Sequence, residues 1–325
     1  MRDIINLYMG ICGKTPYMQP DILSEEWYLL TQKKIMTAYL TAAAVAGIGL
    51  AVWRIAIMLR YYDPYNGEFS HSAGAELRTF GYVALGLVLL MATSYFFIRK
   101  SEFVPFSASS NQFSVFSSSL YGFVFAAVGI MLVIYYAKIL FGAQSGTFFR
   151  VIQILSFLLL FVSAAYFIFS ASVGRSESPA KKALSFCPAL WALCYLVTSY
   201  INPDYNFNDP NRVLCNVSLA ALALFLLYET RNTVARPQNP ARFAISLVAA
   251  VCVLAYILPL FCLTAFWEVP MAPSTLFEAV ECGAVFYIFA VLYTMTVSVK
   301  KAETAATEEL PAEPTEGPLP NATEE

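Results

Sequence analysis

The residues in this sequence that are best able to do chemistry are charged side chains within long apolar stretches. Arg54 lies in an apolar stretch at residues 36–59, and Glu278 and Glu281 lie near the start of another at 276–298. A charged side chain at the centre of a bilayer costs at least ~2.5 kcal/mol unless it is paired or hydrated. These three residues are therefore the first candidates for an internal binding site.

The two glutamates favour different roles. Thr275 and Glu278 have the spacing of a capping box, in which the Glu side chain bonds back to the start of its own helix. Glu281 lies deeper and has no such role, so we expect it to pair with Arg54 at the mouth of a polar cavity that opens outward. The alternative is that both charged groups extend to the membrane surface.

A second group of polar residues follows one face of the fourth apolar stretch. Arg150, Gln153 and Ser156 recur at helical spacing, and Lys138 ends the preceding stretch beside the same short loop. We expect Arg150, Gln153 and Lys138 to extend the cavity around Arg54. A hydrated helix face near the membrane surface is the alternative.

Acidic residues in two loops are candidates for contacts outside the membrane. Asp63 follows the first apolar stretch, and Asp204 and Asp209 precede the sixth. Asp204, Asn206 and Asn208 alternate as at the start of an EF-hand calcium loop, but the glycine and the final glutamate of such a loop are missing. We expect Asp63, Asp204 and Asp209 either to contact a cation or sugar or to form ordinary tight turns.

Catalytic and metal-binding patterns are missing from the sequence. It contains one histidine, His71, and no HExxH, GxSxG or Walker motif. His71 and Glu76 have a spacing that resembles the His-Asp pair of some membrane acyltransferases, but a solvent-exposed loop histidine is the simpler interpretation. The seven cysteines include no CxxC pair. The sequence thus favours a protein that is not an enzyme and holds no metal or cofactor.

Eight apolar stretches must position these residues. Most reach the ~20 residues that cross ~30 Å of hydrocarbon, and the chain is 58% hydrophobic and 13% charged, beyond what a soluble domain contains. They lie at residues 36–59, 79–98, 113–137, 149–170, 183–200, 213–229, 243–266 and 276–298. The sixth is the weakest, because it is short and carries Asn216 and Ser218. We predict an all-α bundle of eight transmembrane helices.

Proline and glycine residues indicate how these helices meet. Pro259 lies inside the seventh stretch, where a proline frees backbone carbonyls and either kinks the helix or lines a site; we favour the kink. Gly47 and Gly49 in the first stretch, and Gly122 and Gly129 in the third, allow two backbones to approach closely. These residues favour a tightly packed bundle.

The lysines and arginines predict the orientation of the chain. Fourteen of them fall on the side of the N-terminus and five on the opposite side, and the richer side is cytoplasmic. We therefore predict a multi-pass protein of the cytoplasmic membrane with both termini inside. The expected segments are a cytoplasmic leader at 1–35, helices one to four at 36–171, a cytoplasmic linker at 172–182, helices five to eight at 183–299, and an acidic disordered tail at 300–325.

Two short segments carry a resemblance to known sequences. The run FCPALW at residues 186–191 and the run LFLLYETR at 224–231 resemble segments of uncharacterised polytopic membrane proteins of anaerobic Gram-positive bacteria. The resemblance covers mainly the fifth and sixth stretches. It implies a bacterial cytoplasmic membrane and implies no activity.

The sequence leaves three functions open. The first is a transporter or permease-like protein for a neutral or lipid-like substrate, because no charged residue lies near the middle of the membrane to couple ions. The second is a non-catalytic sensor, scaffold or partner subunit of a membrane complex. An intramembrane enzyme is the least favoured. The expected partners are the lipid bilayer, other membrane proteins or a second copy of the chain, and not nucleic acid, because no basic stripe is present.

Overall fold

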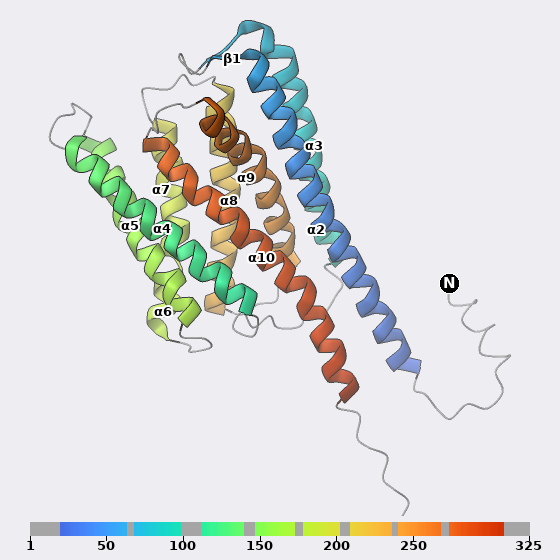
Figure 1. Cartoon of the computed structure of the whole chain (residues 1–325). Coiled ribbons are helices and arrows are strands. Elements are labelled where there is room, and N and C mark those ends of the chain that lie inside the picture. The colour runs from blue at the N-terminus through green and yellow to red at the C-terminus, as the bar shows by residue number, and fades with distance from the viewer. Residues whose placement is uncertain are drawn as a thin grey trace, which may run out of the picture.

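The fold is an all-α bundle, seen in a computed structural model (Figure 1). The structure describes residues 20–63, 68–98, 112–139, 147–172, 178–201, 209–235, 240–267 and 273–308. It contains eight helical segments that are long and apolar enough to cross a membrane. The predicted eight spans are thus confirmed, and the chain is a multi-pass integral membrane protein.

The helices follow the predicted stretches closely. They are α2 (Pro20–Tyr61), α3 (Gly74–Ile98), α4 (Gln112–Ile139), α5 (Thr147–Ser172), α6 (Pro179–Leu184), α7 (Cys187–Ile201), α8 (Pro210–Ala235), α9 (Pro240–Trp267) and α10 (Pro273–Glu308). The fifth span consists of α6 and α7 together. Between α2 and α3 lie a short antiparallel hairpin of β1 (Tyr62–Asp63) and β2 (Glu68–Phe69) and a 3-10 helix, η1 (His71–Ala73).

Prolines explain where many of these helices begin. A proline is well suited to the first turn of a helix, because the N–H that it lacks has no partner within the helix there. The helices that begin with a proline are α2, α6, α8, α9 and α10. Pro188 likewise occupies the second position of α7.

Two helices extend furthest beyond their predicted ends. α2 begins at Pro20, so the last part of the predicted leader is helical, which the acidic residues of its first two turns favour through the helix dipole. α10 continues to Glu308, so the first part of the predicted disordered tail is helical. That extension is rich in Lys, Ala and Glu, which are good helix formers. The rest of the leader and of the tail lies outside the described residues.

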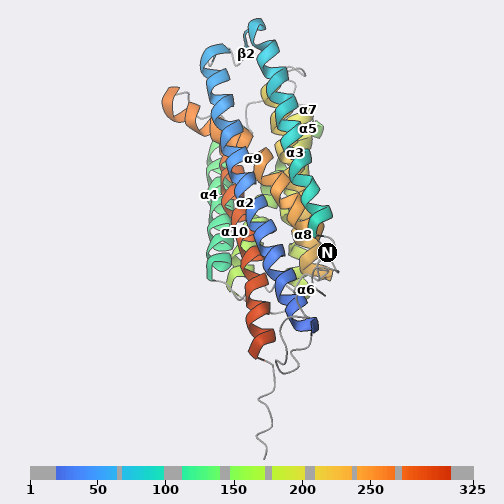
Figure 2. The ribbon, with the colours of Figure 1, turned by 90° about the vertical axis from the view of Figure 1, so that its right-hand side faces the viewer.

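The helices form a ring with a helix pair on one side. The α4, α5, α7, α8, α9 and α10 helices contact one another in turn, and α10 closes the ring against α4. The α2 and α3 helices pack outside the ring on α9, and Figure 2 shows this pair in front of the bundle. We call the end that carries β1 and β2 the hairpin end, and the end that carries Pro20 and Glu308 the terminal end (Figure 1).

Aromatic side chains fill the interior of the ring. Tyr287 of α10 contacts Tyr121 of α4, Phe167 of α5 and Phe225 of α8, with ring centroids 5.3, 5.2 and 5.9 Å away. Such pairs contribute ~0.5–1.5 kcal/mol beyond the burial of their surface. Because these contacts reach α10 from three helices, they tie the ring together across its centre.

Close helix contacts occur at some of the predicted glycines. A Cβ added at Gly122 would lie 2.8 Å from Ile168 of α5, and one added at Gly47 would lie 2.8 Å from Leu254 of α9. A Cβ at Gly129 would lie 3.1 Å from Phe161. Gly49 has open space beside it within the described part of the chain. Three of the four glycines therefore lie where side-chain bulk would push helices apart.

Candidate functional site

The buried guanidinium of Arg54 binds three acceptors on two other helices. Arg54 is 3% exposed. Its Nη1 donates to the carbonyl oxygens of Ala255 at 3.2 Å and Tyr256 at 3.3 Å on α9, and its Nη2 donates to Asn211 Oδ1 on α8 at 2.6 Å. The guanidinium also lies 5.4 Å from the centre of the Tyr256 ring, within the range of a cation-π contact.

Pro259 explains why Arg54 lies there. A proline inside a helix has no N–H to donate, so the carbonyl four residues earlier loses its partner. Pro259 lies inside α9, and that carbonyl belongs to Ala255. Arg54 supplies the missing donor. The backbone group freed by Pro259 is therefore bound by a residue of α2.

Glu281 is fully buried and only partly hydrogen-bonded. Its Oε2 accepts a hydrogen bond from Ser218 Oγ on α8 at 2.8 Å. Its Oε1 has no hydrogen-bond partner among the described residues. The contacts of the described residues do not include the predicted ion pair with Arg54, because the donors of Arg54 bind the α9 carbonyls and Asn211 instead.

Glu278 contacts the neighbouring helix. Its Oε1 accepts a hydrogen bond from the Tyr256 hydroxyl at 3.2 Å. The side chain of Thr275, the partner expected in a capping box, lies outside the described side chains. Tyr256 thus joins Arg54, which lies over its ring, to Glu278, which binds its hydroxyl. We call the following residues the hairpin-end cluster: Arg54, Asn211, Ser218, Tyr256, Glu278 and Glu281.

Further buried polar atoms lie on the helices of the ring. The Tyr121 hydroxyl, Trp191 Nε1 and Asn216 Oδ1 are buried and have no hydrogen-bond partner within the part of the chain that the structure describes. The Tyr121 hydroxyl is close enough to Glu281 for the two groups to interact electrostatically. Buried polar atoms are nearly always paired in proteins, so this group is unusual.

Asp209 caps α8 and supports the cluster from the hairpin end. It directly precedes Pro210, and its Oδ1 accepts a hydrogen bond from the backbone N–H of Asn211 at 3.0 Å, as an N-cap residue does. Burial raises the pKa of the Asp209 carboxyl, and hydrogen bonds and the charges of Arg54 and Arg212 oppose that rise only in part. Asp209 therefore fixes the backbone of Asn211, the residue that accepts a hydrogen bond from Arg54.

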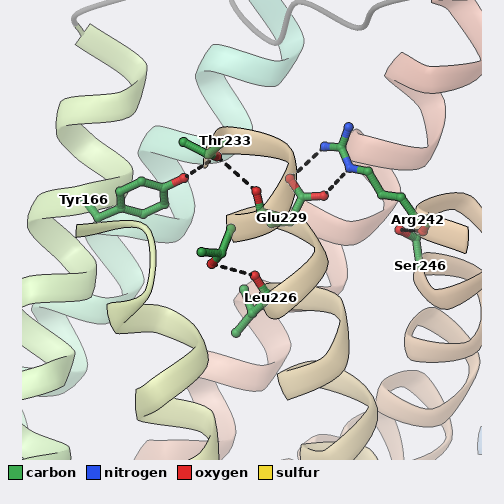
Figure 3. A network of polar contacts seen from close by, with 7 residues as sticks. Tyr166, Leu226, Glu229, Thr233, Arg242 and Ser246 are labelled. Carbon is green, nitrogen blue, oxygen red and sulfur yellow. Dashed lines mark hydrogen bonds and ion pairs between the residues drawn. The ribbon is translucent and has the colours of Figure 1, made fainter. Parts of the chain in front are cut away.

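A second polar network lies at the terminal end (Figure 3). Arg242 of α9 donates from Nε and Nη2 to the two carboxylate oxygens of Glu229 on α8, at 2.6 and 2.7 Å. Thr233 Oγ1 donates to the Glu229 backbone carbonyl at 3.0 Å, and the Tyr166 hydroxyl lies 3.4 Å from Thr233 Oγ1. The two parallel hydrogen bonds between Arg242 and Glu229 are strong and directional. They fasten α8 to α9 and orient both side chains.

The other predicted site residues are not brought into the hairpin-end cluster by any described contact. Gln153 is half-buried on α5, and Asp63 is half-buried in β1. Lys138 and Arg150 lie on α4 and α5, but their side chains are outside the described set, and Asp204 lies outside the described residues. The proposed extension of a cavity toward these residues stays a prediction.

His71 and Glu76, whose spacing resembles a catalytic pair, have separate surroundings. His71 is exposed in η1, while Glu76 accepts a hydrogen bond from the Tyr61 hydroxyl at 3.0 Å. Across the described ranges, no group of three His, Cys, Asp or Glu side chains is placed to hold a metal ion. The polar chemistry that the described contacts do assemble lies in the hairpin-end cluster and the terminal-end network.

Sequence reasoning identified Arg54, Glu281 and Pro259 but missed most of the residues that contact them. Tyr256 and Asn211 carried no signal, because a tyrosine in an apolar stretch and an asparagine beside a proline are common. Ser218 did carry one, since its hydroxyl weakened the sixth stretch. A polar residue in a span needs a partner, and the structure shows that Glu281 is the partner of Ser218.

Comparison of the chain with protein-family models, with curated proteins and with solved structures finds no match. The class of protein is therefore inferred from the fold alone. Eight apolar helices in the described ranges, six of them in a ring with a buried carboxyl group between α8 and α10, make this chain a multi-pass integral membrane protein with buried polar contacts.

Proposed function

We propose that this protein is a transporter or permease-like protein, in which the ring of α4, α5, α7, α8, α9 and α10 surrounds the path of a small solute. The observation that carries the proposal is the Glu281 carboxyl, which is fully buried inside a membrane-spanning helix and leaves one oxygen without a hydrogen-bond partner among the described residues. Ionisable residues within spans typically line substrate or ion paths.

The cost of burying this group supports a functional role. A buried polar group without a partner costs ~1–3 kcal/mol relative to a satisfied one, and packing alone is served better by an apolar residue. The polar atoms of Tyr121, Trp191 and Asn216 that lack a partner in the described part of the chain add to that cost. A solute that enters the ring would supply the partners that these atoms lack.

The aromatic contacts across the ring describe a packed conformation. Tyr287 touches side chains from three other helices, so a solute must displace aromatic side chains to pass. A carrier that opens to one side at a time needs such a packed state between its open ones. We therefore assign this conformation to the closed state of the transport cycle.

The proposal includes the predicted orientation. The terminal end faces the cytoplasm of a bacterial cell, and the hairpin end faces outward, since the end richer in Lys and Arg is cytoplasmic. The hairpin-end cluster then lies toward the outer surface, where a solute from outside would first reach it.

Water access to the interior tests the transport function. In a variant whose native cysteines are replaced by alanine, Ser218→Cys places a thiol beside Glu281, and Val217→Cys places one at the neighbouring position, where Val217 is 47% exposed on the outer surface of the bundle. A membrane-impermeant, negatively charged thiosulfonate is added to intact membranes. We expect the thiol at position 218 to react and the lipid-facing thiol at position 217 to stay unmodified.

Each outcome decides the proposal. Modification at position 218 alone supports a water-accessible path through the ring, because a thiol must ionise in water before it reacts. A thiol at position 218 that stays unmodified in a correctly folded protein overturns the transport function. Size-exclusion chromatography of the purified variants establishes their folding.

A membrane scaffold or partner subunit is the second candidate, and the surface of α3 favours it. The α3 span is the least buried of the eight, because only 17% of its apolar window is buried inside the bundle. Gly81 and Gly86 on this helix are exposed and have open space beside them in the described structure, and small residues let a second helix approach closely. An unmodified thiol at position 218, together with oligomers that Gly81→Leu dissolves, would favour this function.

A further inference from the structure

The charge state of Glu281 follows from what surrounds it. Among the described residues, no Lys or Arg lies within ion-pair distance of its carboxyl group. The donors of Arg54 are directed at Ala255, Tyr256 and Asn211. An ionised carboxyl without a cation is expensive in a core of low dielectric constant. In this conformation Glu281 is therefore a neutral carboxylic acid.

The titratable groups that face Glu281 from the surrounding helices supply no compensating charge. Those that interact with it electrostatically are Tyr121 of α4, Cys215 of α8, Tyr256 of α9 and Glu278 of α10. Each of them is neutral or negative at pH 7. Within the described part of the chain, none of these groups supplies the positive charge that an ionised Glu281 would need.

A stack of aromatic rings includes one residue, Phe277, that lies one helical turn from this carboxyl group on α10. Phe277 precedes Glu281 by one helical turn, so its ring shares that face. The Phe277 ring stacks on Tyr195 of α7 with centroids 4.6 Å apart, and the Tyr195 ring stacks on Trp191 at 5.9 Å. Aromatic faces attract cations, most strongly where water is excluded. A carboxyl group one helical turn from a ring of this stack suits a cation that carries apolar groups.

The same surroundings disfavour a metal ion. Hard metal cations require several oxygen ligands at once, whereas the hydrogen-bond partner of Glu281 among the described residues is a single serine hydroxyl. No group of three His, Cys, Asp or Glu side chains is found together in the described ranges. An organic cation needs only one opposite charge and an apolar wall.

We propose that Glu281 binds a monovalent organic cation in exchange for a proton, with Phe277, Tyr195 and Trp191 as its aromatic wall. The proposal rests on the transport function above and names its substrate class, which replaces the neutral or lipid-like substrate expected from the sequence. When the cation binds, the carboxyl group releases its proton to water, and the carboxylate that remains neutralises the cation. The buried site thus stays electrically neutral in both states, and cation and proton compete for one group.

Competition of this kind gives a measurable pH dependence. Where Glu281 is protonated in the free protein, each unit of pH increase raises the apparent affinity for the cation up to about tenfold, because one proton must leave for each cation bound. A permanently charged probe, such as tetraphenylphosphonium, separates this effect from titration of the ligand itself. Binding to the purified full chain is followed by isothermal titration calorimetry from pH 6 to 9.

Three variants make the test specific. Glu281→Gln keeps the size of the side chain and its bond from Ser218 but cannot release a proton; we expect at least tenfold weaker binding and no pH dependence. Glu281→Asp keeps the acid and is expected to keep the pH dependence. Glu76→Gln removes an acid on α3 that lies outside the hairpin-end cluster, and this variant is expected to keep the pH dependence as well. Thermal melting of each variant confirms that it folds.

The outcomes separate this proposal from the transport function. Binding that Glu281→Gln leaves intact, or binding by the wild type without pH dependence, overturns the cation site. If tetraphenylphosphonium does not bind but the thiol at position 218 is modified, the path stands and the substrate class is wrong. If that thiol also stays unmodified, both proposals fail.

Discussion

At the scale of single residues, Arg54 is explained by a proline on another helix. Sequence alone indicated that an arginine within a span needs a partner, and it indicated separately that Pro259 frees a carbonyl. The sequence could not indicate that Arg54 donates to the carbonyl freed by Pro259, because this contact depends on how α2 packs on α9. The same holds for Glu281, whose burial is visible only once α8 lies beside α10.

The link between Arg54 and Pro259 is testable by a double-mutant cycle. Arg54→Met removes three hydrogen bonds from a charged group, at ~1.5–3 kcal/mol each, but it also removes the cost of burying that charge. We therefore expect a net fall of about 3 kcal/mol in the free energy of unfolding. In Pro259→Ala, residue 259 regains a backbone N–H that can donate to the Ala255 carbonyl. The cost of Arg54→Met in this background should therefore be smaller by about 1 kcal/mol or more. Unfolding of the purified protein in mixed micelles measures both. An equal cost in the two backgrounds would refute the link.

Asp209 carries a prediction about helix capping. Asp209→Ala removes the acceptor for the Asn211 N–H, so we expect a loss of ~1 kcal/mol in unfolding free energy. Asp209→Asn keeps that acceptor and should lose much less. Equal effects of the two substitutions would argue against the cap.

The charge of Asp209 adds a pH dependence with a defined sign. Because burial raises its pKa in the folded protein, the folded state binds this proton more tightly than the unfolded state does. The wild type is therefore expected to lose stability relative to Asp209→Asn as the pH rises from below the ordinary Asp pKa of ~3.9 through the raised value. The difference in stability is measured by the melting temperatures of the wild type and Asp209→Asn from pH 3 to 7.

At the scale of elements, the terminal-end ion pair fixes how α8 meets α9. Arg242 and Glu229 are 7% and 12% exposed at their side chains and form two parallel hydrogen bonds. Removing one member leaves the other charge buried and unpaired, which costs ~3–5 kcal/mol. We expect Arg242→Met alone, or Glu229→Gln alone, to lower the free energy of unfolding by ~3–5 kcal/mol.

The double variant is the control for that prediction. With both charges removed, no buried charge stays unpaired, so Arg242→Met with Glu229→Gln should destabilise far less than the sum of the two single changes. Unfolding free energies of the four proteins supply the comparison. Additive losses would show that the two residues act independently.

The spans could be predicted from the sequence, and their ends could not. Hydropathy reports the hydrocarbon core, so all eight stretches were found. It says nothing about helix outside that core, and α2 and α10 both continue there. The break between α6 and α7 was also missed. There, Thr230 of α8 donates to the Ser185 carbonyl at 2.6 Å, a contact between residues far apart in the sequence.

At the scale of the whole molecule, the orientation in the membrane is a prediction from charge. Both described ends of the chain lie at the terminal end (Figure 1), and the positive residues assign that end to the cytoplasm. A reporter enzyme that is active only outside the cytoplasm should be inactive when fused after Arg231. It should be active when fused after Asp209. The opposite pattern would reverse the orientation.

The central claim is that the interior of the six-helix ring is a path for a solute, and the reactivity of a thiol beside Glu281 tests it most directly. The transport function predicts that Ser218→Cys in intact membranes reacts with a charged, impermeant thiosulfonate at least about ten times faster than Val217→Cys. Equal, negligible rates at the two positions in folded protein would contradict it. They would show a solid bundle in which Glu281 meets no water.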